Sequence, residues 1–504
     1  MDLVPLCCVK PEAPIVDTIQ AREGLAGILP YLFDNVPCLL AGVSSDWTLN
    51  ADSVKGLLAE LSEAELAVPV DDASCTRRSM PLREFLRRSL EQGERGLYAK
   101  DLHIDLEQRR RGAGPLYPVP FAFKDDWLNW YWHTCRAGEE PGDDYSFLYV
   151  GGPGSRTAVH HDVLLSYSWS VNIVGRKLWT LVPPHASAAL FDGSSELVRD
   201  LRPGAFDEQR FPNLRACARL EVVQEQGTAL FVPAGWYHQV DNLEEGGAEG
   251  LTVSVNRNWF NSFSLARVWR FLRGELLAVR AELVHFRRSV PPVSDMGLGV
   301  GRSQSTGMGM GEEEWLRHCE TILRCNAALG LSDWLELVSA RALMMHACFR
   351  RLRGCCCCAA AGAVCGHQVQ ALGRALCPRY GDGRGGGDGG ESDEELCRLL
   401  LDTRSPHLRR SRGAALPGEA KQVADPEDED EEEWEGGGGE EPWSVFAFSC
   451  SEMLRVLRAV RRCPEAMEHL GANVGEAEGL VPAMMSELSR LLEGLLQAAA
   501  ASES

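Results

Sequence analysis

The chain has 504 residues, of which 45% are hydrophobic, so it is long enough to bury a large core and to form several domains. Its formal net charge of −21 argues against a nucleic-acid-binding surface, since phosphate backbones attract basic faces. About half of that charge lies in residues 425–441, which include 11 acidic residues and no basic one, so the rest of the chain is only mildly acidic.

The first 20 residues are predicted to form a loose leader. The start, MDLVPLCCVKPEAP, has no basic segment followed by an apolar one, which argues against a secretory signal, and no run of 18 apolar residues is present to span a membrane. We therefore expect the 18 cysteines to be free thiols in a reducing compartment. This predicts a cytoplasmic protein, with the nucleus left open.

Helical and strand-like patterns follow in order. Residues 21–61 are predicted to form helices and buried segments. RSMPLREFLRRSLEQ then has helical spacing, which places four apolar residues on one side: Leu82, Phe85, Leu86 and Leu90. Short strand-like runs come next, bounded by Gly, Pro or Asp: GLYAKDLHI, YSFLYVGG, TAVHHDVL, SWSVNIV, KLWTLVP, TALFVP and LTVSVNRNW. Many short strands without alternating long helices favour a sandwich or barrel such as a jelly roll.

After Trp259 the pattern becomes helical. An amphipathic helix is predicted from the spacing of six residues: Leu265, Val268, Trp269, Leu272, Leu276 and Leu277. More helix is predicted over 312–353, and again near 448–462 and 481–499. These patterns divide the chain into a β domain with N-terminal helices (21–260), a helical extension (261–353), a low-complexity acidic insertion that we expect to be disordered (354–442), and a short helical tail (443–504).

One strand-like run contains a metal-ligand pattern. His160 and Asp162 are two residues apart, so on a strand both point to the same face, while His161 points to the other. His238 follows two further strand-like runs that could return it to the same place. Two imidazoles and one carboxylate form the facial triad of non-haem iron oxygenases. The H-x-D spacing is a weak signal by itself, and it occurs again at His103 and Asp105.

Two further residues fit an anion beside such a metal. Lys177 begins the run KLWTLVP, and a buried lysine there would need an anionic partner such as a dicarboxylate. A surface lysine at a strand start is the alternative interpretation. Thr157 could add a hydroxyl to the same carboxylate, or it could be an ordinary strand threonine. Trp169, Trp179 and Trp236 could form the walls of the site or simply pack in the core.

Together, T-x-x-H-x-D, S-W-S-V-N, G-x-K and F-V-P-x-G-W-x-H-Q-V-x-N resemble the jumonji-C family of 2-oxoglutarate oxygenases, over residues 20–350. The resemblance implies a mainly β core, a double-stranded β-helix or cupin-like jelly roll, with flanking helices and an α+β fold overall. It also implies the cofactors Fe(II), 2-oxoglutarate and O2. The implied roles by residue are iron binding for His160, Asp162 and His238, binding of the distal carboxylate of 2-oxoglutarate for Lys177 and Thr157, and proximity to that cosubstrate for Ser170, Asn256 and Tyr98.

The resemblance further implies that the protein hydroxylates a lysine side chain of a eukaryotic translation termination factor. A carboxylate at the mouth of the site would suit the lysine ammonium, and Asp241, Glu244 and Glu245 follow His238, although a solvated loop explains them as well. The alternatives are a jumonji-C histone or protein lysyl demethylase, and a non-catalytic jumonji-C scaffold or metal-binding cupin. The protein substrate is the only partner that we expect, without nucleic acid or membrane, and the oligomeric state stays open.

Overall fold

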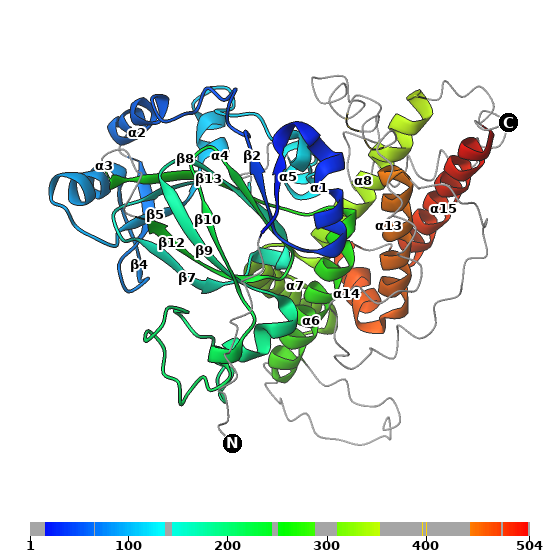
Figure 1. The fold of residues 1–504 in the computed structure, drawn as a ribbon. Coiled ribbons are helices and arrows are strands. Elements are labelled where there is room, and N and C mark those ends of the chain that lie inside the picture. The colour runs from blue at the N-terminus through cyan, green and yellow to red at the C-terminus, as the bar shows by residue number, and fades with distance from the viewer. Residues whose placement is uncertain are drawn as a thin grey trace, which may run out of the picture.

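The computed structural model describes residues 16–64, 66–136, 144–243, 250–287, 310–352, 396, 400, 444–474 and 477–501 (Figure 1). The predicted insertion at 354–442 therefore lies outside the described residues, apart from Leu396 and Leu400. The predicted leader at 1–20 is described only from residue 16, and its last residues form the short strand β1.

Two sheets form the centre of the fold. The larger has nine strands, in the spatial order β1 (Thr18–Gln20), β2 (Cys38–Ala41), β11 (Ala229–Val232), β8 (Tyr167–Val174), β13 (Thr252–Trp259), β6 (Ser146–Gly151), β5 (Tyr98–His103), β3 (Ala67–Asp71) and β4 (Arg77–Pro81). The smaller has four, in the order β10 (Leu220–Gln224), β9 (Arg176–Val182), β12 (Tyr237–Leu243) and β7 (Arg156–His160). β1 and β2 are parallel, and the other pairs are antiparallel. The predicted jelly-roll core is confirmed.

Strand β8 shows how the sequence creates an inside and an outside. Tyr167, Trp169 and Val171 belong to the main hydrophobic core outside the larger sheet, which the helices cover. The alternating residues Ser168 and Ser170 point the other way, toward the smaller sheet. An apolar cluster between the sheets joins strands of both: Trp179, Leu181, Val222, Leu230, Val232, Trp236 and Val240. The interior of the barrel therefore combines an apolar cluster with a row of small polar side chains.

Helices surround the sheets. They are α1 (Gly24–Asp34), α2 (Ser53–Glu63), α3 (Leu82–Leu86), α4 (Ile104–Arg110), α5 (Trp127–Thr134), α6 (Leu265–Leu283), α7 (Glu312–Ala327), α8 (Leu331–Leu352), α13 (Val445–Arg462), α14 (Pro464–Val474) and α15 (Ala477–Ala501). Figure 1 shows the strands on one side and α13–α15 on the other, next to α6–α8. None of the described helices has both the length and the hydropathy needed to cross a bilayer.

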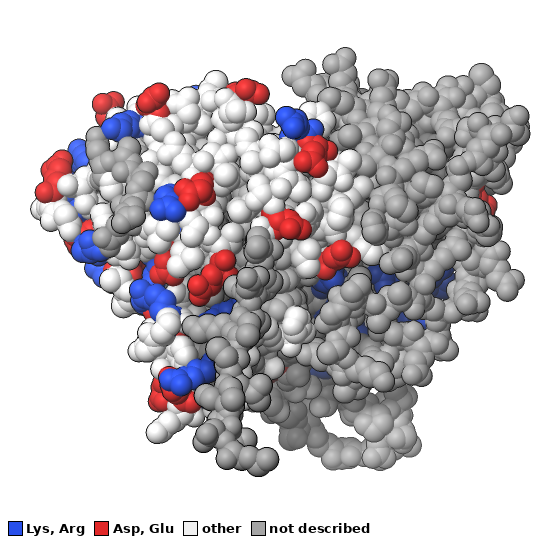
Figure 2. All heavy atoms as spheres, in the orientation of Figure 1, with Lys and Arg blue, Asp and Glu red and all other residues white. Residues whose placement is uncertain are grey.

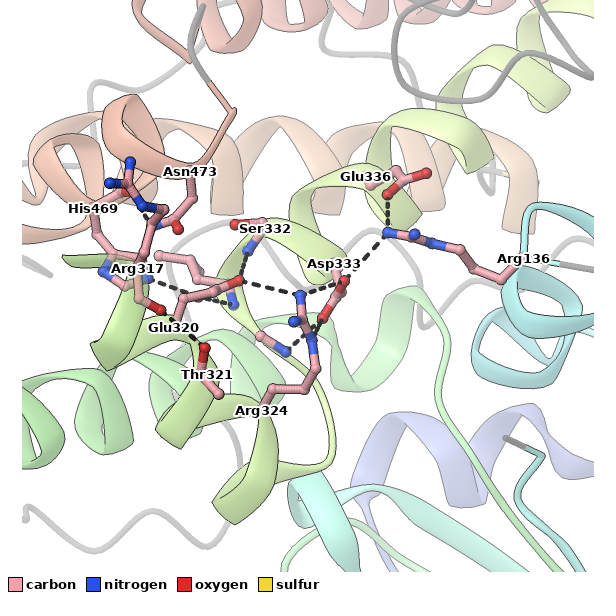
Figure 3. Close-up of polar contacts among 12 residues, drawn as sticks. Arg136, Arg317, Glu320, Thr321, Arg324, Ser332, Asp333, Glu336, His469 and Asn473 are labelled. Carbon is pink, nitrogen blue, oxygen red and sulfur yellow. Dashed lines mark hydrogen bonds and ion pairs between the residues drawn. The ribbon is translucent and has the colours of Figure 1, made fainter. Parts of the chain in front are cut away.

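The helices after the insertion share the core of the sheet. Val255 of β13, Leu457 of α13 and Leu488 of α15 all belong to one continuous hydrophobic cluster. Polar contacts add to this attachment at the α7–α8 corner (Figure 3). There, His469 Nε2 of α14 lies 2.6 Å from Glu320 Oε2, and the backbone N–H groups of Leu331 and Ser332 donate to the same carboxylate. The C-terminal segment is thus an integrated part of the fold.

Three helical predictions were wrong in detail. The predicted helix in RSMPLREFLRRSLEQ begins only at Leu82, because the residues up to Pro81 pair with β3, and a residue before proline disfavours the helical conformation. A π-helical turn over Arg87–Glu91 then changes the spacing, so Leu90 is exposed. Leu277 is also exposed, since its neighbour Leu276 occupies the buried stripe of α6.

Other elements were merged or missed. The helix predicted over 312–353 is two helices, separated where Ala328 adopts a left-handed backbone. Helix α14, which starts at Pro464, was not predicted. Strands β3, β4 and β10 were also not predicted, and β2 lies inside the segment predicted as helical and buried.

The described surface carries both signs of charge. On the face drawn in Figure 2, basic and acidic side chains alternate, and the described part of this face has no extended patch of either sign. Ion pairs such as Arg78–Asp72 and Arg176–Glu225 match this mixed pattern. The large negative charge of the sequence is therefore not concentrated on the described part of this face.

Candidate metal centre

His160, Asp162 and His238 converge between the two sheets. Their ligand atoms, one from each residue, all lie within 4.8 Å of one another. His238 Nε2 is 4.0 Å from Asp162 Oδ2, and the two imidazole centroids are 4.2 Å apart. Within the described residues, no other His, Cys, Asp and Glu side chains form such a group.

Strands β7 and β12 bring these side chains together, because His160 and His238 are directly paired in the ladder. β7 ends at His160, but Asp162 keeps an extended backbone with φ −70° and ψ 153°. The alternation of the strand therefore continues for two more residues, and Asp162 reaches the same side as His160. His161 lies with its ring 5.1 Å from that of Tyr237, outside the group.

Both histidines are held in an orientation suited to a metal. His160 Nδ1 lies 2.9 Å from the carbonyl oxygen of Ala158, and His238 Nδ1 lies 3.1 Å from that of Trp236. Each Nδ1–H can donate to its carbonyl, which leaves each Nε2 lone pair for a ligand bond. Desolvation, followed by the neighbouring His238, lowers the pKa of His160 to about 3, so its imidazole is neutral at neutral pH.

The carboxylate of the group has its own support. Ser168 Oγ donates a hydrogen bond of 2.7 Å to Asp162 Oδ2. Ser168 lies on β8, in the larger sheet, so this bond ties the metal-ligand loop of one sheet to the interior of the other. Sequence reasoning missed this residue, although strand alternation in SWSVN places Ser168 on the same face as Ser170.

Lys177 is buried inside the barrel with 1% of its surface exposed. Its ammonium donates a 2.5 Å hydrogen bond to Ser254 Oγ and lies 5.7 and 5.8 Å from the ring centroids of Tyr149 and Trp179. No carboxylate of the described chain forms an ion pair with it. Burial, followed by the charge of Lys100, lowers the pKa of Lys177 to about 7. An unpaired buried ammonium of this kind fits an anionic ligand.

A β-bulge explains how Thr157 shares the side of His160. Residues three apart on a regular strand point to opposite faces. Here His238 pairs with His160 and Val240 pairs with Thr157, so two residues of β7 lie opposite the single residue Gln239. Because His238 and Val240 share a face, Thr157 and His160 do as well.

Ser170 and Asn256 are directly paired between β8 and β13 and face the same interior. The Ser170 hydroxyl is buried and has no hydrogen-bond partner among the described residues. The side-chain oxygen of Asn256, Oδ1, accepts a 3.2 Å hydrogen bond from Ser254 Oγ, which is also the partner of Lys177. Both predicted residues therefore lie in the polar row that leads to Lys177.

Tyr98 approaches the same region from β5. Its hydroxyl is hydrogen-bonded to the side chain of Asn242, and Asn242 is the ladder partner of Lys177. Burial is the main cause that raises the pKa of Tyr98, so its phenol is neutral at physiological pH. The structure thus gathers all eight predicted site residues along one interior surface.

Other residues suggested by the sequence lie elsewhere. Trp169 belongs to the core outside the larger sheet, whereas Trp179 lies inside, with its ring 5.6 Å from that of His238. Trp236 belongs to the apolar cluster between the sheets. The carboxylate of Asp241 points away from the triad and accepts a hydrogen bond from Gln239. Glu244 and Glu245 lie outside the described residues.

The donor set fits a divalent transition metal and a dicarboxylate. Two imidazole nitrogens and one carboxylate can occupy one face of an octahedron and leave the opposite face for small ligands. His160 and Asp162 keep partial exposure although they face inward. The unpaired ammonium of Lys177 and the free hydroxyl of Ser170 lie in the same interior.

Comparisons with known proteins point to the same chemistry. A family model described as a cupin-like domain matches residues 30–265. The 2-oxoglutarate and iron-dependent oxygenase JMJD4 of Danio rerio is 32% identical over 335 residues, and the match covers 62% of this chain and 71% of that protein. The protein of the same name from Homo sapiens is 31% identical over 340 residues, with coverages of 62% and 73%. The arginine-specific demethylase JMJ20 of Arabidopsis thaliana is 34% identical over 274 residues, with coverages of 48% and 56%.

Proposed function

Because the chain belongs to the jumonji-C family of 2-oxoglutarate- and iron-dependent oxygenases, we propose that it hydroxylates a lysine side chain of a eukaryotic translation termination factor. The chain is an oxygenase, and its cofactors are iron and 2-oxoglutarate. The identity of the protein substrate and of the modified residue is the part that we propose.

One observation carries the assignment of the site. A His–Asp–His group lies in the same barrel interior as a buried lysine that has no carboxylate partner in the described chain. His160, Asp162 and His238 would hold the iron, and Lys177 would hold the far carboxylate of 2-oxoglutarate. A structural polar core would instead be expected to pair its buried lysine.

Bound iron supplies the oxidising chemistry, in which O2 places one oxygen atom in a C–H bond of the substrate and the other in succinate, as 2-oxoglutarate loses carbon dioxide. The residues of this chain bind and orient. Ser168 fixes the Asp162 carboxylate, and the carbonyls of Ala158 and Trp236 fix the two imidazoles. The ring of Trp179 lies 5.6 Å from that of His238 and would cover one side of the metal site.

Demethylation of arginine is the second candidate, because a relative with 34% identity is named an arginine-specific demethylase. The two reactions use the same site and differ in their products. Hydroxylation leaves one additional oxygen on the side chain, whereas oxidation of an N-methyl group releases formaldehyde. A termination factor is the test substrate for lysine hydroxylation. A peptide with a methylated arginine is the test substrate for demethylation.

The test is incubation of the purified chain with Fe(II), ascorbate, 2-oxoglutarate and a eukaryotic termination factor, followed by peptide mass spectrometry and a formaldehyde assay. We expect a gain of one oxygen on a lysine. His160→Ala should abolish it, and His318→Ala, which removes an exposed histidine of α7 outside the barrel, should not. Formaldehyde from a methylated arginine peptide, with an unmodified termination factor, would replace the first candidate with the second.

A further inference from the structure

Asp101 has an unusual backbone for a residue inside a strand. Its φ is +56°, in the left-handed region that residues other than glycine rarely adopt. The cause is a bulge in β5. Ala99 pairs with Val150 and Leu102 pairs with Leu148, so Lys100 and Asp101 together lie opposite the single residue Tyr149. Regular alternation would turn Asp101 toward the helices, whereas the bulge turns it inward.

The bulge brings the Asp101 carboxylate to a residue of the site. The Tyr149 hydroxyl donates a 2.8 Å hydrogen bond to Asp101 Oδ1, and the Lys177 ammonium lies 5.7 Å from the centre of the same tyrosine ring. Phe147 stacks beside Tyr149 at 6.2 Å, and His103 meets Phe147 edge-on at 5.0 Å. The Tyr149 side chain therefore lies between Asp101 and Lys177, and it belongs to a row of rings with Phe147.

Asp101 also remains accessible. Its side chain is 32% exposed, whereas that of the neighbouring Asp71 is 7% exposed and is held by Lys100 at 2.7 Å. The second oxygen of Asp101 lies 2.7 Å from Arg77 Nη1, and the Arg77 side chain is 50% exposed. Arg77 also contacts Asp71 through Nε at 2.9 Å, so a cation from solvent can replace it at Asp101 while Arg77 keeps its contact with Asp71.

We propose that Asp101 recognises a cationic side chain of the protein substrate, lysine or arginine, and that Arg77 occupies this carboxylate while no substrate is bound. This inference rests on the proposed function, because it assumes a protein substrate with a basic residue. A carboxylate provides charge-assisted hydrogen bonds to an ammonium or guanidinium, and the adjacent aromatic faces favour the same cation. Asp241 cannot take this role, since it faces away from the triad.

The first experiment measures binding rather than turnover. Two peptides that differ only in a central lysine or norleucine are titrated into the iron- and 2-oxoglutarate-loaded protein without oxygen. The wild-type chain should prefer the lysine peptide by about five- to tenfold, the range for a partly exposed charged hydrogen bond. Asp101→Asn keeps an acceptor for Tyr149 and should lose that preference. Asp72→Asn is the matched control, because Asp72 pairs with Arg78 in the same way, outside the interior, and it should keep the preference.

Arg77→Ala supplies an independent readout. If Arg77 competes with the substrate cation, its removal should tighten lysine-peptide binding, whereas a purely structural arginine would leave binding unchanged or weaken it. An unchanged lysine preference in Asp101→Asn overturns the proposal, and so does the absence of any preference in the wild type. If the wild type hydroxylates a termination factor but Asp101→Asn shows an unchanged KM for it, this inference fails and the proposed function stands. If the lysine preference depends on Asp101 but the termination factor is not modified, the proposed substrate fails and this inference stands.

Discussion

The Lys177 ammonium and the Ser254 hydroxyl lie 2.5 Å apart inside the barrel, and this hydroxyl is the only described side chain that accepts a hydrogen bond from the lysine. A single neutral acceptor cannot satisfy the three donors of an ammonium. The remaining donors suit the two oxygens of a carboxylate. Lys177 should therefore contribute to the affinity for 2-oxoglutarate.

Lys177→Met should therefore raise the KM for 2-oxoglutarate by roughly 10- to 100-fold, the loss expected when a charged hydrogen bond is removed. Methionine fills a similar volume without the charge, so the melting temperature should stay the same or rise. Iron binding should be unchanged, because the substitution alters none of the three metal ligands. Succinate formation at increasing 2-oxoglutarate concentration measures the first effect. An unchanged KM would show that the distal carboxylate binds elsewhere.

The affinity for 2-oxoglutarate should also depend on pH. Burial lowers the pKa of Lys177 to about 7 in the ligand-free protein, and the carboxylate binds the protonated form. Affinity should be constant below pH 7 and should fall about tenfold per pH unit above it. Binding at pH 8 should take up a proton. Calorimetry in buffers of different ionisation enthalpy measures this uptake, and a flat profile between pH 7 and 9 would contradict the assignment.

The same low pKa makes a prediction for stability. In the unfolded chain the lysine has its ordinary pKa near 10.5, so between pH 7 and about 10.5 the unfolded state binds more protons than the folded state. The contribution of Lys177 to the free energy of unfolding should therefore increase as the pH rises through this window. Lys177→Met should lack this contribution in urea titrations, and an equal pH slope in both proteins would argue against it.

Ser168→Ala should weaken metal binding. The serine holds the Asp162 carboxylate at 2.7 Å, and loss of such a supporting hydrogen bond costs about 10- to 100-fold in metal affinity. Ser170→Ala is the control on the same strand and face, because its hydroxyl has no described partner and should affect 2-oxoglutarate rather than iron. Competition for Fe(II) with a chelator gives both affinities. Equal effects of the two substitutions would mean that Ser168 has no special role at the ligand.

The metal ligands could be predicted because their pattern depends only on the two-residue alternation of a strand, which holds at His160 and Asp162. Thr157 and Asp101 show where this reasoning ends. In each case a β-bulge changes the face of the sheet to which the side chain points. A bulge depends on how two strands pair, so it cannot be predicted from the sequence of one strand. The family resemblance identified Thr157 without the bulge, and no comparable motif pointed to Asp101.

The helical part shows a similar division. The stripe of α6 is readable because four of its residues, Leu265, Val268, Leu272 and Leu276, recur at helical spacing. Helix α14 was not predicted, because its buried residues are few and include His469, whose burial depends on a partner 149 positions earlier. Polar groups that are buried as a pair carry no local hydrophobic signal. Whether such a segment forms a buried helix therefore depends on tertiary contacts.

Breaking the Glu320–His469 pair should destabilise the fold and leave the metal site intact. His469→Leu removes the closest side-chain partner of the buried Glu320 carboxylate and leaves Arg324 at 3.8 Å, and loss of one member of a buried pair costs up to about 3 to 5 kcal/mol. Burial alone would raise the pKa of Glu320, but the His469 hydrogen bond outweighs it and lowers that pKa. The stabilisation is therefore present above the ordinary glutamate pKa and is lost as the pH falls below it. Urea unfolding at pH 7 and at pH 4 should show a smaller difference between wild type and His469→Leu at the lower pH.

A double variant, Glu320→Leu with His469→Leu, should recover part of the loss of stability. Its failure to do so would assign the cost to packing of α14 rather than to the carboxylate that lost its histidine partner.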